Sequence, residues 1–230
     1  MAKNTNISSN LSQISKRISQ IERTFQRPAG SVQLLAVSKR KPADMIRAAA
    51  ACGQISFGEN YADEGASKAE ELSDLKLEWH YIGHVQSNKT RLISATYDWV
   101  QSIDREKIAQ RLSTQRPSEL PPLNVCLQVN IDGEESKSGC APDELVTLAS
   151  HVSSMERLTL RGIMAIPAPQ TDVNAQRKVF RRLHTLYQQI RSNHPTVDTL
   201  SMGMTADMEA AISEGATMVR IGTAIFGQRD

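Results

Sequence analysis

The sequence predicts a closed barrel of eight parallel β-strands, each followed by a helix: the α/β class known as a (β/α)8 or TIM barrel. Eight short apolar segments alternate with helical patterns along the 230 residues. These segments are too apolar for a sheet with one face in water, which favours parallel strands covered by helices. No G-x-G-x-x-G follows the first segment and no Walker A motif occurs. Both absences argue against the structural alternative, a doubly wound open sheet.

Each expected strand is a short apolar run bounded by glycine or polar residues. The runs cover residues 33–38, 54–58, 78–83, 97–103, 123–131, 158–166, 197–203 and 217–222. Helices are expected behind Pro42, from about Tyr61 and from Thr205, with a short final helix after Gly222. The length suits one barrel and no Gly/Ser-rich linker interrupts it, so we predict a single domain over residues 1–230.

Residues 1–30 are expected to add an N-terminal helix that packs on the barrel. Apolar residues recur there at spacings of three and four, at Leu11, Ile14, Ile18, Ile21 and Phe25. Ser8 or Ser9 is the expected N-cap. Partner binding is one interpretation of such an amphipathic helix, but we expect it to close the bottom of the domain.

Composition and charge argue against several classes of protein. The 27 basic and 25 acidic residues are scattered and leave a net charge of +2, so no basic stripe suits a nucleic acid. Cys52, Cys126 and Cys140 are odd in number and form no C-x-x-C pair. We therefore expect reduced packing cysteines in a cytoplasmic protein without a metal site. No apolar run approaches the roughly 20 residues that span a bilayer, and no signal region begins the chain, so we expect neither export nor membrane insertion.

Lys39 is the first candidate functional residue, because functional groups of such barrels lie where the strands end. Period-two alternation places Leu35, Val37 and Lys39 on the inner face of the first strand. Partial desolvation disfavours the ammonium form and supplies a free amine that attacks an aldehyde. Taken alone, a strand-end lysine that reaches solvent is the simpler interpretation.

The last two expected strands end in segments that suit a phosphate group. Ser201 and Gly203 precede the expected helix start at Thr205. Gly222 and Thr223 precede the short final helix. Barrels commonly bind phosphate at these two turns through backbone N–H groups and a helix N-terminus. Tight turns without a ligand are the alternative for either segment.

Arg220 lies two residues before Gly222 and is expected to point into the same mouth. A buried guanidinium is costly without an acceptor. The acceptor is either a structural ion-pair partner or a ring nitrogen of a bound cofactor.

Six segments occur in one order along the chain: LLAVSK, FGENY, WHYIGHVQSNK, IMAIPAP, LSMGMTADMEAAI and GATMVRIGTAIFG. From about residue 34 to residue 228 they resemble the pyridoxal phosphate homeostasis protein family, also called the proline synthetase co-transcribed homologue family. The resemblance implies a fold similar to the barrel domain of alanine racemases, of the fold-type III class that binds pyridoxal phosphate.

The same resemblance implies a set of cofactor-binding residues. Lys39 is expected to hold pyridoxal 5'-phosphate as a Schiff base, and Arg220 is expected to face the pyridine nitrogen. The remaining implied contacts are Ser201, Gly222 and Thr223 at the phosphate, and Asn60, His80 and Met204 along the cofactor.

The function expected from the resemblance is a cofactor carrier in intracellular pyridoxal phosphate homeostasis, with transfer to apo-enzymes. Weak pyridoxal phosphate-dependent amino-acid racemisation is the alternative. An arginine at the pyridine nitrogen leaves the ring a weaker electron sink. We also expect no further domain that would supply a second acid/base, which favours a monomer and disfavours racemisation. A phosphate-sugar aldolase and a regulatory binding protein without bound aldehyde remain open.

Transfer of the cofactor requires an attacking amine, and Lys137 is a candidate for that role. It lies in the segment NIDGEESKSG after the fifth expected strand, with Gly133 and Gly139 as hinges. A solvated surface loop is the alternative interpretation.

Overall fold

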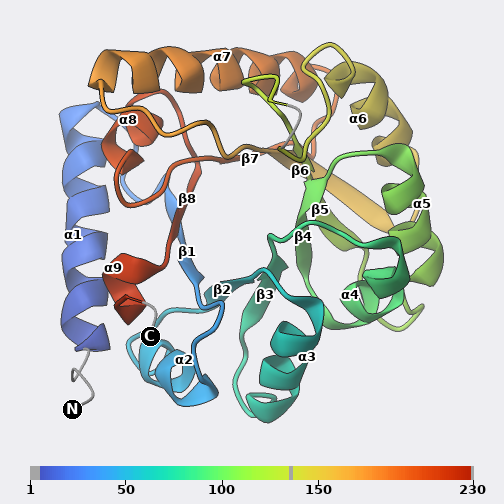
Figure 1. Cartoon of the computed structure of the whole chain (residues 1–230), viewed down its shortest axis with the longest axis horizontal. Coiled ribbons are helices and arrows are strands. Elements are labelled where there is room, and N and C mark those ends of the chain that lie inside the picture. Colours follow the sequence, from blue (N-terminus) through green and yellow to red (C-terminus); the bar gives the residue numbers. More distant parts are fainter. Residues whose placement is uncertain (1–5, 135–136, 229–230) are drawn as a thin grey trace.

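The computed structural model describes residues 6–134 and 137–228, in which eight parallel strands pair in chain order and close into a barrel (Figure 1). The last strand is hydrogen-bonded to the first, so the sheet has no free edge. The strands are β1 (Gln33–Val37), β2 (Ser56–Glu59), β3 (Glu78–Tyr81), β4 (Trp99–Ile103), β5 (Leu123–Gln128), β6 (Leu158–Met164), β7 (Thr199–Ser201) and β8 (Met218–Ile221). Each overlaps its expected segment, and the predicted fold class is confirmed.

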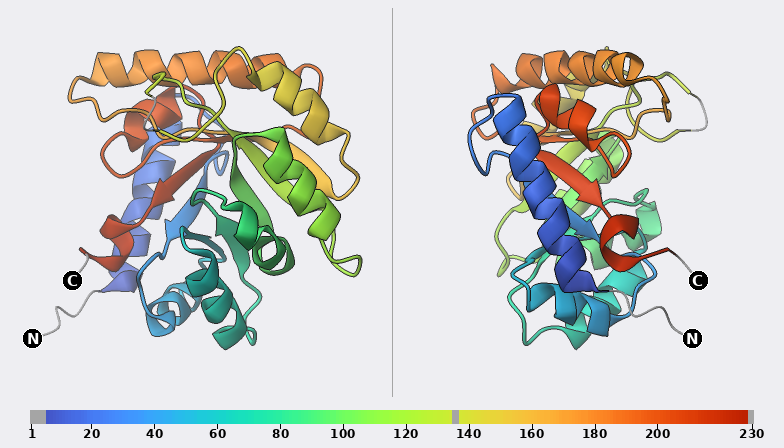
Figure 2. Two further views of the ribbon diagram at one scale, coloured as in Figure 1. Left: turned by 45° about the vertical axis from the view of Figure 1, so that its right-hand side comes forward. Right: turned by 90° about the vertical axis from the view of Figure 1, so that its left-hand side faces the viewer.

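Helices surround the ring of strands on its outside (Figures 1 and 2). They are α1 (Ile7–Thr24), α2 (Ala43–Ala50), α3 (Ala62–Glu71), α4 (Thr90–Thr96), α5 (Glu106–Gln115), α6 (Leu145–Ser153), α7 (Val173–Arg191), α8 (Met208–Ser213) and α9 (Thr223–Phe226). Within the described parts of the chain, no helix is long and apolar enough to cross a membrane.

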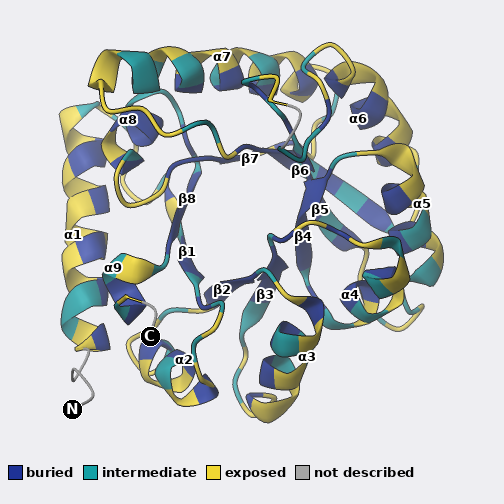
Figure 3. Cartoon of the chain, viewed as in Figure 1, coloured by how far each residue is buried: buried dark blue, intermediate teal, exposed yellow. Residues whose placement is uncertain are grey.

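The strands are buried along most of their length, as the dark ring in Figure 3 shows. Side chains on their outer faces, such as Ala36, Phe57 and Val100, are fully buried in one core that the helices cover. Because both faces of the strands are shielded from water, the strand sequences lack the alternation of a half-exposed sheet. This burial leaves the two ends of the barrel as the places where polar side chains of the strands reach solvent.

The N-terminal helix α1 lies against the outer wall of the barrel and does not close its bottom, which corrects the sequence prediction. It contacts α2, α8 and α9, and it crosses the outside of β8 (Figure 2). It thereby covers the wall that the four-residue α9 is too short to cover. Its N-cap is Asn6, whose side chain accepts a hydrogen bond from Ser9 N at 3.0 Å, and not Ser8 or Ser9 as expected.

Two further sequence expectations differ from the structure. Helix α8 begins at Met208, three residues after Thr205, because the Asp207 side chain accepts from Met204 N and forms a turn there first. Cys126 and Cys140 are buried as expected for packing residues, but Cys52 is exposed just after α2.

Strands β6 and β7 approach each other closely at Gly162. It lies at a register shift in β6 with φ of +156°, and a Cβ there would stand 1.7 Å from the carbonyl oxygen of Thr199. We expect Gly162→Ala to lower the free energy of unfolding by about 4 kcal/mol or more, because backbone must move. Urea denaturation measures the loss.

Gly53→Ala is the matched control for this prediction. Gly53 also has a positive φ, +90°, but nothing lies within 4 Å of a Cβ there. Its loss should be about 1–2 kcal/mol, the cost of the backbone conformation alone. Equal losses for the two variants would contradict the close approach of β6 to β7.

Candidate functional site

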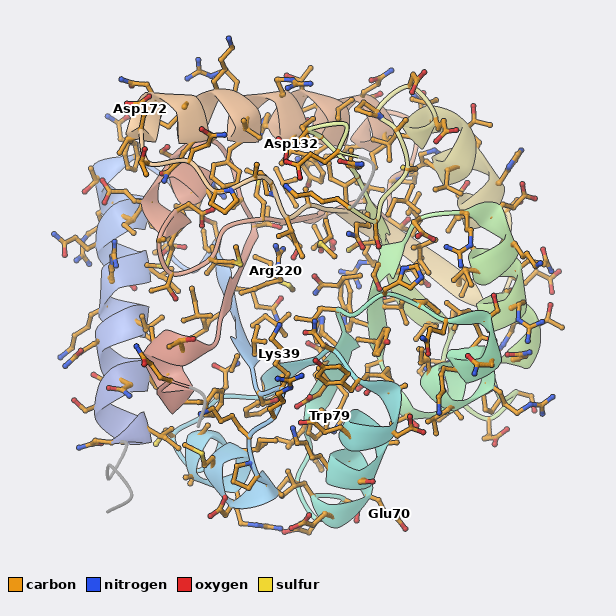
Figure 4. All side chains as sticks on the ribbon, viewed as in Figure 1. Lys39, Glu70, Trp79, Asp132, Asp172 and Arg220 are labelled. Atoms are coloured by element: carbon orange, nitrogen blue, oxygen red, sulfur yellow. The ribbon has the colours of Figure 1, made fainter. Side chains whose placement is uncertain are left out.

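Lys39 lies in the turn directly after β1, at the end of the barrel where the β-to-α loops gather (Figure 4). It is half-buried, and Leu35, four residues earlier on the same face, is fully buried inside the ring. The expected inward orientation agrees with this gradient from core to mouth. Neighbouring strands bring other candidates close: a Cβ on Gly222 would lie 3.1 Å from Val37 O, two residues before Lys39.

Arg220 on β8 is buried inside the barrel, with 4% of its surface exposed. One terminal nitrogen donates to Ser201 O at 2.7 Å and to Ser201 Oγ at 2.8 Å, and the other donates to Ala165 O at 2.7 Å. Each of these acceptors is neutral, so none cancels the charge. Burial lowers the pKa of Arg220 to about 10, which still leaves the group a cation at neutral pH.

A chain of hydrogen bonds crosses the barrel interior from Arg220. Ser201 Oγ accepts from Arg220 and donates to Gln101 Oε1 at 2.7 Å. The amide nitrogen of Gln101 then donates to His80 Nδ1, at 2.9 Å. Because Nδ1 accepts, the proton of a neutral His80 lies on Nε2. Gln101 and His80 are fully buried, so these bonds form without competition from water.

Glu78 ends the chain at the opposite end of the barrel. Its Oε1 lies 2.8 Å from His80 Nε2, and its Oε2 accepts from Trp99 Nε1 at 3.1 Å. Ser56 also donates to Oε1, at 2.9 Å. Burial alone would raise the pKa of Glu78, but hydrogen bonds, that from His80 foremost, lower it to about 2. Ser201, Gln101 and His80 thus link a buried cation to a carboxylate.

The hydrogen-bond chain shows that Ser201 and His80 do not lie where the sequence predicted. Ser201 is fully buried and its hydroxyl bonds Gln101 and Arg220, so it supports the guanidinium instead of facing an open phosphate cup. His80 is fully buried and stacks on Trp99, with ring centroids 5.0 Å apart. Ile82, directly after β3 and two residues beyond His80, lies closer to the mouth: its Cδ1 is 3.1 Å from where a Cβ on Gly58 would stand.

Asn60 carries a buried polar atom that lacks a partner among the described residues, its side-chain oxygen Oδ1. The residue follows β2 and lines a cavity of about 310 Å³ together with Tyr61, Tyr81 and His84. Gly83 allows the close approach of this loop, since a Cβ there would lie 2.1 Å from Asn60 O. An unsatisfied buried acceptor at the mouth suits a bound ligand that donates to it.

The turns after β7 and β8 differ in what they offer a ligand. Met204 is 40% exposed at the rim, but its N–H already donates to Asp207, at 2.6 Å. Gly203 has φ of +94°, and a Cβ there would lie 2.5 Å from the Ala211 methyl group, so it lets α8 pack closely. Gly222 is the N-cap of α9, and Thr223 is its exposed first residue. The first N–H groups of a helix have no partner within it.

Lys137 is held by two carboxylates on its own loop. Its Nζ lies 3.0 Å from Asp132 Oδ2 and 3.2 Å from Glu134 Oε1. Burial would lower the pKa of Lys137, but the hydrogen bonds to these carboxylates raise it instead. A raised pKa keeps the amine protonated, so the geometry does not favour attack by Lys137 on an aldehyde.

Sequence reasoning missed Gln101 and Glu78, which connect the site through the barrel. Glu78 shares an inner face with His80, which was a candidate and lies two residues later, and Gln101 lies two residues after Trp99. A glutamine in the middle of the otherwise apolar fourth strand was a readable signal, because a buried amide needs partners. Continuing the alternation past His80 would likewise have placed Ile82 nearest the mouth.

The barrel is of the alanine racemase type: the family model for the N-terminal domain of alanine racemase matches residues 9–230. The solved alanine racemase of Corynebacterium glutamicum superposes with a TM-score of 0.70 at 17% identity, over 97% of this chain and 61% of that chain. At this identity the likeness concerns the fold alone.

Relatives that match over nearly their whole length show which family of alanine racemase-type barrels this chain resembles. A pyridoxal phosphate homeostasis protein of Pseudomonas aeruginosa is 54% identical over 224 residues, 97% of this chain and 96% of that protein. That of Escherichia coli is 51% identical, covering 97% of each. PipY of Synechococcus elongatus, solved with pyridoxal phosphate bound, has a TM-score of 0.82 at 34% identity over 96% of this chain and 100% of that chain. The chain belongs to the pyridoxal phosphate homeostasis protein family, and the resemblance seen in the sequence is confirmed.

Gln101→Leu tests the chain inside the barrel. It leaves Ser201 Oγ without an acceptor and His80 Nδ1 without a donor in the core. Because each unsatisfied buried group costs about 1–3 kcal/mol, we expect the free energy of unfolding to fall by about 3 kcal/mol. Gln110→Leu is the control, since Gln110 bonds Thr114 on the exposed side of α5. A similar small loss in both variants would contradict the importance of the chain.

Glu78→Gln tests the acid dependence of stability. The pKa of Glu78 is lowered from 4.5 to about 2 in the fold, so its contribution is present above about pH 4.5 and is lost as pH falls towards 2. The difference in unfolding free energy between wild type and Glu78→Gln should therefore be largest above pH 4.5 and shrink towards pH 2. Denaturant titrations over this range measure it, and a pH-independent difference would contradict the lowered pKa.

Proposed function

We propose that this chain binds pyridoxal phosphate in the barrel mouth, holds it as a Schiff base on Lys39, and takes part in intracellular pyridoxal phosphate homeostasis. One observation carries the proposal: Lys39 lies two residues beyond the end of β1, while a buried Arg220, hydrogen-bonded to neutral oxygens, occupies the adjoining β8, where it pairs in register with Leu35. An amine and a fixed cation on neighbouring strands suit an aldehyde whose ring also carries a hydrogen-bond acceptor. The names of the whole-length relatives and the cofactor bound to PipY support the same ligand.

The residues at the mouth fit this group. Gly222 and Thr223 would hold the phosphate with N–H groups at the start of α9 and with the Thr223 hydroxyl. The unsatisfied Oδ1 of Asn60 would accept a hydrogen bond. For the covalent link, Lys39 would supply the amine that condenses with the aldehyde, and the carbonyl oxygen would leave as water.

The permanent protonation of Arg220 favours storage of the cofactor over racemisation of amino acids. The bound cofactor is an electron sink whose strength depends on protonation of its ring nitrogen. Arg220 keeps its own proton at neutral pH, because its pKa is about 10, and so does not protonate a ring nitrogen that it faces. This supports reversible storage over racemisation.

Delivery to apo-enzymes is the finer part of this proposal. All residues assigned to the cofactor lie in this chain, so the proposal requires no residue from a partner. Lys137, paired with Asp132 and Glu134, keeps its place at the rim as part of an ion pair and not as the transferring amine. Release then depends on water or on an amine of the receiving enzyme.

Borohydride reduction tests the Schiff base directly. Purified protein incubated with pyridoxal phosphate should gain an absorption band in the visible or near ultraviolet. After reduction it should carry a pyridoxyl-phosphate adduct, which tandem mass spectrometry places on Lys39. Lys39→Ala should lose both the band and the adduct. Lys41→Ala is the matched control, because Lys41 lies in the same turn and its Nζ bonds Gln228 O on the surface.

Two results would contradict the proposal. One is wild-type protein that stays colourless at saturating cofactor. The other is an adduct that persists at another lysine in Lys39→Ala with unchanged affinity.

A further inference from the structure

A cluster of charged and polar side chains lies behind Lys39, between β1, β2 and α3. Its members are Ser38, Glu59, Glu64 and Lys68, called here the turn cluster. Glu59 ends β2 and is fully buried, Lys68 on α3 has a side chain 8% exposed, and Glu64 is 27% exposed. The cluster is outside the hydrogen-bond chain of the barrel interior, and nothing in the proposed binding of the cofactor uses it.

The ammonium group of Lys68 has three acceptors in this cluster. It lies 2.8 Å from Glu59 Oε1, 2.6 Å from Glu64 Oε1, and 2.9 Å from the carbonyl oxygen of Ser38. Three acceptors match the three protons of the ammonium group. Glu64 and Lys68 are four residues apart on one face of α3, so the helix presents both groups to the same point.

The other contacts of the cluster hold the turn that carries Lys39. Ser38 Oγ donates to Glu59 Oε1 at 2.6 Å, and Arg40 N donates to Glu64 Oε1. The turn closes with a bond from Lys41 N to Ser38 O, and Arg40 adopts φ of +58°, a conformation unusual for a residue other than glycine. The residues immediately before and after Lys39 are thus both bonded to the cluster.

Stability alone is a poor explanation for such a cluster. Buried ion pairs lose so much hydration that apolar replacements of the same volume are often neutral or stabilising. Burial raises the pKa of Glu59, and Lys68 only partly offsets this effect. The cluster therefore costs free energy that an apolar contact between α3 and β2 would not cost. Its directional hydrogen bonds to Ser38 and Arg40, however, fix the backbone of the turn more firmly than apolar contacts would.

We propose that Lys68 is a positioning residue for Lys39: through Ser38, Glu59 and Glu64 it fixes the turn that aims the Lys39 amine into the barrel mouth. The inference rests on the proposed function, because the aimed amine is the group that captures the aldehyde. Lys68 itself stays behind the strand wall and does not touch the cofactor.

Lys68→Met is the direct test, since methionine keeps an unbranched side chain and removes all three donors. Stopped-flow absorbance would follow capture of pyridoxal phosphate by the folded protein, well below its unfolding temperature. We expect capture to slow by about tenfold or more, because small misplacements of a reacting group reduce its rate strongly. Circular dichroism should match wild type. A purely structural role would change only the unfolding temperature.

Two variants accompany this test. Lys89→Met removes an exposed ion pair between Lys89, in the loop after β3, and Asp63, which lies on α3 like Lys68. This variant should capture cofactor at the wild-type rate. Lys68→Arg keeps a cation with several donors and should recover part of the rate lost in Lys68→Met. If Lys68→Met does not fold, Glu64→Ala replaces it: Glu64 is partly exposed, and its loss frees Arg40 N and one donor of Lys68.

The outcomes separate this inference from the proposed function. Normal capture by wild type with slowed capture by Lys68→Met, or by Glu64→Ala in its place, supports both. Wild-type rates in the variant overturn the positioning role and leave the Schiff base on Lys39 standing. Equal slowing in Lys89→Met also overturns it, because any ion pair of α3 would then suffice. Absence of capture by wild type overturns both.

Discussion

Burying the guanidinium of Arg220 inside a ring of strands costs several kcal/mol unless its donors are hydrogen-bonded. The barrel meets this cost with oxygens from two other strand ends, Ser201 and Ala165. Because Ser201 Oγ accepts from Arg220, its own proton needs another acceptor, which is Gln101 Oε1. The amide nitrogen of Gln101 in turn bonds His80, so two more polar side chains lie in the interior. One buried cation therefore explains why the core of this barrel is polar along one line, where branched apolar side chains usually fill such barrels.

Two networks reach the mouth from different directions. The chain from Glu78 to Arg220 runs inside the ring, whereas the turn cluster of Ser38, Glu59, Glu64 and Lys68 lies outside it. They converge on adjoining strands, since β1 and β8 pair along four residues. The amine and the cation are thus fixed by independent sets of bonds. Preorganisation of this kind lowers the entropy lost on binding, because neither group has to be ordered by the ligand.

The eight strands were predictable because each is buried on both faces and therefore appears in the sequence as a short, mostly apolar segment. The inward position of Arg220 was predictable because alternation fixes the face of β8 on which it lies. Depth was harder to predict: His80 and Ser201 share the inner face, yet lie below the mouth. The contacts of Lys68 could not be predicted from the sequence, because its three acceptors come from β2, α3 and the segment directly after β1, and no sequence period connects these elements.

A protein that stores a reactive aldehyde has to bind it tightly without activating what is bound. In the proposed function Arg220 would serve both needs, because a cation with a pKa of about 10 would attract a ring acceptor but would not give up its proton to it. The hydrogen-bond partners of Arg220 are neutral oxygens, and the carboxylate of Asp207 acts on it through space, opposing the effect of burial on its pKa. The carboxylate of the interior chain, Glu78, is instead kept at the far end of the barrel, with Ser201, Gln101 and His80 between the two charges.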